Sequence, residues 1–271
     1  MSEIFLIVSL ALFGLVFGSF ITALSYRSIR GVSIFKGRSL CPLCKKKISW
    51  SDNIPIISYL SLNGKSRCCG KPISWRYPLI EFFTMLTFLL IGLVYTNCST
   101  VTPPLCVLNN TFSFLVLPYL LLISLFLITV FITDFEHKII LDEFIFIPYG
   151  LTLLLLIFFN PEFSYTNIFL SFACAAFLLL VHLITRGKGM GLGDVKLALL
   201  PPLILGWPFT LPWLFLSFII GALVGVILML MKKAKFGKQI PFGPFLILAF
   251  FLVLFWGDKL MFLFGFLTLS P

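Results

Sequence analysis

About eight long apolar runs dominate the sequence and leave few folds open to it. An apolar run of about 17–25 residues is long enough to cross a bilayer as a helix. The chain is 60% hydrophobic and 11% charged, whereas a soluble domain carries about 25% charged residues. We therefore predict an all-α polytopic membrane protein. Its spanning helices are expected at residues 4–26, 77–95, 114–133, 144–159, 168–185, 195–206, 211–231 and 241–257.

Two of these runs differ from the others. The run at 195–206 is short and contains Pro201 and Pro202, and proline interrupts helical hydrogen bonding. We expect this run to be kinked and only partly helical. The first run lacks a preceding basic segment and is long enough to span, so we expect a membrane helix there and no cleaved signal peptide.

The positive charges predict how the helices are oriented. The net charge is +10, and all of the 20 basic residues except Lys259 lie in or beside the four loops after the first, third, fifth and seventh runs. Basic loops stay in the cytoplasm, so we expect these loops to be cytoplasmic and both chain termini to lie outside. The charge then reflects topology and contact with the lipid bilayer, and nucleic acid is not expected as a partner.

Two aspartates lie at the cytoplasmic ends of apolar runs. Asp134 directly follows the run at 114–133, and Asp194 precedes the run at 195–206. Ionisable residues in such places are costly and usually functional. Two carboxylates a few ångströms apart share a proton, so one can act as base and the other as acid on a water molecule that attacks a peptide bond. The alternative for Asp194 is a cap on the following helix, a role also open to Asp142.

The glycines before Asp194 and two other polar residues in the apolar runs can be given structural roles. Four alternating glycines precede Asp194, at positions 187, 189, 191 and 193. Glycine tolerates positive φ and lets an extended substrate approach the backbone closely, although a flexible connector would have the same composition. For Glu81, near the start of the second run, we expect a helix-dipole or hydrogen-bonding role and no part in catalysis. For His182, inside the fifth run, we expect a packed or hydrogen-bonded structural role.

The order of several motifs resembles that of the type IV prepilin peptidases, which belong to the intramembrane aspartyl proteases with a Gly-x-Gly-Asp loop. The resemblance covers nearly the whole chain. Its motifs are Phe17-Gly18-Ser19-Phe20 with Arg27, Cys41-Pro42-Leu43-Cys44, Asn53-Ile54-Pro55-Ile56-Ile57-Ser58, Gly70-Lys71-Pro72-Ile73-Ser74, Tyr77-Pro78-Leu79-Ile80-Glu81, Thr133-Asp134-Phe135-Glu136-His137 with Asp142, Gly189-Met190-Gly191-Leu192-Gly193-Asp194-Val195-Lys196 and Ile240-Pro241-Phe242-Gly243-Pro244.

The resemblance implies an activity and its residues. Members of the family cleave the leader of type IV prepilins or type II secretion pseudopilins after a glycine, at the cytoplasmic face of the bacterial inner membrane. Many members also methylate the new N-terminus with S-adenosylmethionine, and a long N-terminal loop like the one here accompanies that second activity. The catalytic pair would be Asp134 and Asp194. The substrate-facing loop would include Gly189, Gly191, Gly193 and Lys196.

The cysteines of the first loop predict a metal site. Cys41 and Cys44 form a Cys-x-x-Cys pair, and Cys68 and Cys69 follow in the same loop. In a reducing compartment such cysteines bind a metal more readily than they form disulfides, and four of them suit a structural zinc ion. The family pattern would place the third cysteine at Ser66, so the alternative is a degenerate loop held by packing.

The remaining cysteines have other expected roles. Cys98 and Cys106 share an outer loop, where a disulfide between them can form. Cys174, within the fifth run, is expected to be a small packed residue.

The predicted organisation is a first helix at 1–26, a small cytoplasmic zinc-binding loop domain at 27–76 and a membrane peptidase core at 77–271. Two other functions suit parts of the pattern. An ion- or proton-coupled carrier could use Asp134 and Asp194 as its binding site, and a non-catalytic assembly factor for a pilus or secretion machine could keep the same fold. The sequence names neither the particular substrate nor the oligomeric state.

Overall fold

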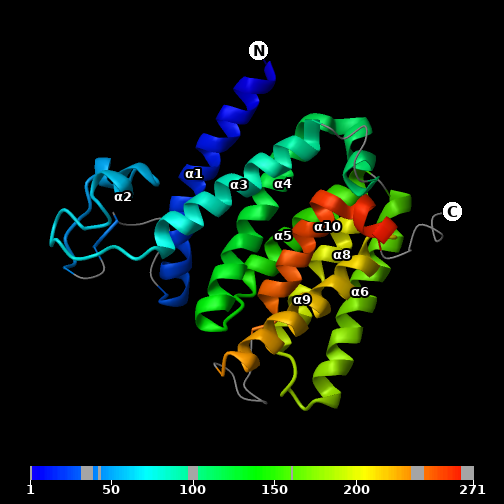
Figure 1. Ribbon diagram of the computed structural model, residues 1–271. Coiled ribbons are helices and arrows are strands. Elements are labelled where there is room, and N and C mark those ends of the chain that lie inside the picture. Colours follow the sequence, from blue (N-terminus) through cyan, green and yellow to red (C-terminus); the bar gives the residue numbers. More distant parts are fainter. Residues whose placement is uncertain are drawn as a thin grey trace. The chain divides into compact units, whose positions relative to one another are not determined.

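The computed structural model describes residues 2–31, 39–41, 44–96, 103–159, 161–232 and 241–263 (Figure 1). Within these ranges the chain is helical apart from loops and two isolated bridges, Leu40 with Lys47 and Lys65 with Pro72. Among the described residues, six helices are long and apolar enough to cross a membrane. These findings confirm the all-α polytopic fold. The elements are α1 (Ser2–Ile29), η1 (Ser51–Asn53), α2 (Ile57–Ser61), α3 (Arg76–Thr96), α4 (Pro103–His137), α5 (Glu143–Phe159), α6 (Pro161–Ile184), α7 (Leu192–Leu197), α8 (Leu200–Leu205), α9 (Thr210–Leu230) and α10 (Gly243–Leu263).

The predicted count of eight spans is only approximate. The run at 195–206 does not form one span, because it divides into α7 and α8, each of six residues. This agrees with the expected kink at Pro201 and Pro202. The fourth predicted span, α5, has 17 residues and falls just short of the six long helices. In contrast, α4 extends past its predicted end, so that Asp134 lies in its last turn.

The chain divides into two compact units, Met1–Leu93 and Val94–Pro271. In the first unit, α1 and α3 pack closely through two glycines of α1. A Cβ on Gly14 would lie 2.6 Å from the Cα atom of Met85, and a Cβ on Gly18 would lie 2.7 Å from the Cα atom of Glu81. Small residues four apart allow this close approach between membrane helices.

Glu81 links α3 to the loop that follows α1. Its carboxylate is buried and accepts hydrogen bonds from the backbone N–H of Ile56, at 2.8 Å, and from the Ser19 hydroxyl. Ile56 has a φ of 57°, which is rare for a β-branched residue. The carboxylate therefore has the hydrogen-bonding role expected for it, and it holds a strained part of the loop against the two helices.

In the second unit, the short helix α8 lies at the centre and contacts α4, α5, α6, α7, α9 and α10. All six of its residues are buried. Two side chains of α6 bond to carbonyl groups at its ends: the Ser171 hydroxyl donates to Leu199 at 2.6 Å, and the Asn167 amide donates to Leu203 at 3.0 Å. An interrupted helix is tolerated inside a membrane protein when its free carbonyl groups have such partners.

Candidate active site and metal centre

Asp134 reaches a buried position because α4 continues for one turn beyond its apolar run. The residue is only 4% exposed, and its Oδ2 atom has no hydrogen-bond partner among the described residues. Thr133, directly before it, is fully buried. A buried carboxylate oxygen without a donor is costly. A shared proton or a hydrogen bond from a reactant would satisfy it.

Asp194 lies in the first turn of α7 and is 7% exposed. Its Oδ2 atom accepts a hydrogen bond from the backbone N–H of Gly191 at 3.1 Å. This is the capping role that the sequence left open for Asp194. Capping engages one oxygen of the carboxylate, so it is compatible with a chemical role for the group.

The fold brings Asp134 and Asp194 together. Their carboxylates are close enough to interact electrostatically, and the backbone amide of Gly243 interacts with both. Gly243 is the first residue of α10, and amides in the first turn of a helix lack partners within the helix and carry partial positive charge. The two carboxylates therefore both lie near the positive end of a third helix.

The side chain of Ile140 packs between Gly193 of α7 and Gly243 of α10. Its side chain packs so closely that a Cβ on Gly193 would lie 3.1 Å from its Cβ, and a Cβ on Gly243 would lie 3.2 Å from its Cδ1. The absence of side chains at Gly193 and Gly243 thus brings the backbone of α7, the start of α10 and the turn after α4 into contact. Because Asp134 and Asp194 are themselves buried, electrostatic interactions at their carboxylates are stronger than they would be in water.

The four alternating glycines are not equivalent. Of the four, only Gly187 has a positive φ, 73°, so the expected left-handed conformation is limited to this position. A Cβ on Gly191 would come within 3.4 Å of the Asp194 carboxylate, and one on Gly189 would press on Thr185 at 2.9 Å. Three of these glycines therefore allow close internal packing in ordinary backbone conformations.

Polar contacts hold both flanks of the glycine loop. His182 Nδ1 lies 2.7 Å from the carbonyl oxygen of Met190, in line with the structural role expected for this histidine. Lys196 donates to both carboxylate oxygens of Asp142, at 2.7 and 2.8 Å. The side chain of Asp142 thus pairs with α7, while its backbone carbonyl accepts the amides at the start of α5.

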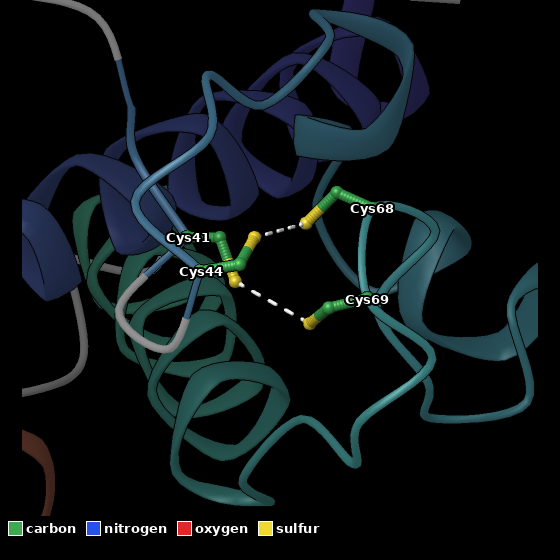
Figure 2. Close-up of side chains that lie close together, drawn as sticks. All are labelled: Cys41, Cys44, Cys68 and Cys69. Carbon is green, nitrogen blue, oxygen red and sulfur yellow. Dashed lines mark hydrogen bonds between the residues drawn. The ribbon is translucent and has the colours of Figure 1, made fainter.

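The four cysteines of the first loop meet, as Figure 2 shows. The sulfur atoms of Cys41, Cys44, Cys68 and Cys69 all lie within 4.8 Å of one another. Cys41 and Cys69 are 3.9 Å apart, close to the edge of about 3.8 Å expected for a tetrahedron of sulfurs around zinc. The Cys44–Cys68 separation of 3.0 Å is shorter than that edge. Four thiols in this arrangement could hold a metal ion.

Two loop segments with the same hydrogen-bond pattern carry these cysteines. In the first segment, Cys41 accepts from the amide of Lys45 and donates to the carbonyl of Lys46. In the second, Ser66 accepts from the amide of Gly70 and donates to the carbonyl of Lys71.

Ser66 is therefore the counterpart of Cys41, and Cys69 is the counterpart of Cys44. The Ser66 hydroxyl lies 3.1 Å from the sulfur of Cys68 and 3.8 Å from that of Cys41. Cys68 thus supplies the fourth sulfur from an adjacent position.

Cys174 is buried with a free thiol, as expected. Cys98 and the side chain of Cys106 lie outside the described residues, so their disulfide stays a prediction. Sequence reasoning missed the place of Gly243 at the carboxylates and the pairing of Asp142 with Lys196. The sequence shows the motif around Gly243 and the charges of Asp142 and Lys196, but no sequence pattern predicts contacts between residues so far apart in the chain.

Two family models match the chain. The Bacterial Peptidase A24 N-terminal domain matches residues 12–95, and the Type IV leader peptidase family matches residues 121–226. The second match includes both Asp134 and Asp194. No solved structure matches the chain.

Relatives named prepilin leader peptidase/N-methyltransferase are similar over most of the chain. The relative from Aeromonas salmonicida is 34% identical over 234 residues, covering 82% of this chain and 72% of the relative. The relative from Pseudomonas aeruginosa is 31% identical over 232 residues, with the same coverage. The relative from Bacillus subtilis is 30% identical over 255 residues, covering 93% of this chain and 95% of the relative.

The fold and site define a polytopic membrane protein with a buried aspartate pair. The chain belongs to the type IV leader peptidase family.

Proposed function

We propose that this protein is a membrane aspartic endopeptidase that removes the leader of type IV prepilins or type II secretion pseudopilins. Cleavage follows a glycine, at the cytoplasmic face of the inner membrane. The observation that carries the proposal is that Asp134 and Asp194 are both buried and both interact with the first amide of α10. Family membership favours this function over a carrier or an assembly factor.

The chemistry follows from two carboxylates that share one proton. The ionised member takes a proton from a water molecule as the water oxygen attacks the scissile carbonyl, and the protonated member donates to that carbonyl oxygen. The departing amine then receives a proton from the pair. The Gly243 amide stabilises the negative charge that remains on the carboxylates, and Gly189, Gly191 and Gly193 let the loop before and within α7 pack closely around the pair.

The proposed orientation places both chain termini outside and the aspartates at the cytoplasmic face. Its support is the concentration of basic residues in four loops, with only Lys259 on the other side. Both Lys138 and Lys196 fall on the side of the aspartates in this arrangement. A leader that has not crossed the membrane would reach the pair from the same side.

Cleavage by purified protein tests the proposal. The full chain in lipid nanodiscs would be mixed with a prepilin that carries its leader. Asp134→Asn and Asp194→Asn should each lower the rate by at least ~10³-fold, with unchanged thermal unfolding. Asp258→Asn, which removes a half-buried carboxylate from α10 far along the helix, is the matched control. Full processing by both dyad variants would refute the function.

We further propose that the protein methylates the new N-terminus with S-adenosylmethionine as donor. The support comes from the relatives, whose names include N-methyltransferase. The donor would supply an activated methyl group, and the acceptor would be the amine released by cleavage. Mass spectrometry of the processed product, with and without the donor, should show the addition of one methyl group only with the donor.

We propose that zinc occupies the four-cysteine cluster in a structural role. An all-thiolate donor set suits this ion, and four protein ligands leave no open position for a substrate. Cys41, Cys44, Cys68 and Cys69 would hold it. Because metal binding and folding of such loops are coupled, the ion would order the segment between α1 and α3.

Metal content and a rescue variant test this site. Cys68→Ser should lose zinc, while Cys174→Ser, the control at a buried thiol away from the cluster, should retain it. The double variant Ser66→Cys/Cys68→Ser restores two equivalent Cys-x-x-Cys segments and should regain the metal. Elemental analysis gives the stoichiometry, and cobalt substitution gives a thiolate absorption band. Zinc retained by Cys68→Ser would exclude Cys68 as a ligand.

A further inference from the structure

The proposed active site depends on a helix that is too short to hold its own position. The helix α7 has six residues, and isolated helices of this length are not stable. The position of Asp194 must therefore come from tertiary contacts around α7. These contacts include the packing of Ile140 on Gly193, the hydrogen bond between His182 and the Met190 carbonyl, and the ion pair of Lys196 with Asp142, besides the packing of α7 on α6, α8 and α10.

Each partner of the ion pair is tied through a short segment to one of the two buried aspartates. Lys196 follows Asp194 by two residues on α7, and Asp142 follows Asp134 by eight residues, in the turn that joins α4 to α5. The backbone of Asp142 is itself held, because its carbonyl accepts the amides of the first turn of α5, at 3.1 and 2.9 Å. The ammonium group contacts both carboxylate oxygens.

We propose that the Asp142–Lys196 ion pair is a positioning device that sets Asp194 against Asp134. The inference rests on the proposed peptidase function of the aspartate pair. It makes Lys196 a positioning residue and gives Asp142 a role beyond the start of α5. The ion pair joins the turn that follows the helix of Asp134 to the short helix that carries Asp194.

The expected effect is local. The side chains of Lys196 and Asp142 are 41% and 56% exposed, and exposed ion pairs contribute little to global stability. A displacement of about 1 Å at a reacting group, however, can lower a rate by about 100-fold. Because the other contacts still hold α7, we expect loss of the ion pair to lower kcat by about tenfold. In the wild-type protein, added salt should weaken the ion pair by screening and thereby lower kcat.

Charge removal and charge exchange test the proposal in the full chain in lipid nanodiscs, with prepilin cleavage as the assay. Asp142→Asn and Lys196→Met should each lower kcat by about tenfold and leave KM unchanged. The exchanged pair Asp142→Lys/Lys196→Asp should recover much of the loss; recovery should be incomplete because a lysine at the start of α5 opposes the helix dipole. Lys232→Met, which removes a lysine after α9, is the control with unchanged kcat.

Three outcomes would overturn the proposal. Full activity of both single variants would show that the pair does not position the site. A higher KM without recovery in the exchanged variant would show that these side chains bind the substrate directly. If the single variants unfold, a wild-type kcat that is insensitive to salt would also contradict it. Asp134→Asn and Asp194→Asn are measured in parallel: activity in those variants would refute the peptidase function itself, independently of the ion pair.

Discussion

Replacement of Gly243 by alanine is the most direct test of how the site is built. A Cβ at this position would lie 2.5 Å from Oδ2 of Asp134, whereas ordinary contacts begin near 3.4 Å. It would also lie 3.2 Å from Cδ1 of Ile140. The Asp134 carboxylate and the start of α10 must therefore separate by about 0.9 Å, the difference between the two distances above.

The size of the effect follows from this displacement. A misplacement of about 1 Å at a reacting group lowers the rate by about 100-fold, which corresponds to about 2.7 kcal/mol in the activation free energy. The same change moves the Gly243 amide away from both carboxylates, and this loss of stabilisation should also lower the rate. Alanine is otherwise acceptable at this position, because it favours helix formation more than glycine does.

The assay is the steady-state cleavage of a prepilin by Gly243→Ala in lipid nanodiscs, with thermal unfolding measured on the same sample. Gly150→Ala is the matched control, since a Cβ at that position in α5 would have no atom within 4 Å. We expect a loss of about 100-fold in kcat for the first variant and none for the second. A folded Gly243→Ala enzyme with wild-type kcat would refute the close approach of α10 to Asp134.

Three further predictions concern the pair and the first unit. Because catalysis needs one protonated and one ionised carboxylate, kcat should rise and then fall with pH; a flat profile would contradict proton sharing. Gly18→Leu should push α1 away from α3 and lower the unfolding temperature, since even a Cβ would lie 2.7 Å from Glu81 Cα. Glu81→Leu should destabilise the first unit by about 1–3 kcal/mol by leaving the Ile56 amide unpaired, and Glu81→Gln, which keeps an acceptor, should cost less. An equal loss for both Glu81 variants would show that the charge, and not the hydrogen bond, is what matters.

Helix content and membrane character were predictable because they depend on local properties. The length of an apolar run and its charge content decide whether it can span a bilayer, and α3, at Arg76–Thr96, lies within one residue of its predicted limits. The break in the sixth run was also predictable from Pro201 and Pro202. The true end of α4 was not, because a carboxylate at an apolar boundary is as compatible with a loop as with a last helical turn.

The candidate site shows the same division. Asp134 and Asp194 could be selected from the sequence, since a carboxylate beside an apolar run is costly unless it has a function. The four cysteines could be selected for their spacing and compartment. Neither argument could identify Gly243, because its importance comes from the absence of a side chain at a point where a distant helix begins.

The sequence by itself determined a polytopic helical protein, two membrane-edge carboxylates and a cluster of four cysteines, because each depends on the composition or spacing of nearby residues. Only the tertiary structure decided that both carboxylates lie at the first amide of α10 and that Lys196 binds Asp142. It also decided that the fourth sulfur of the cluster comes from Cys68, next to Ser66. These contacts join residues from different helices and loops. They depend on how the helices pack, and no local pattern encodes that packing.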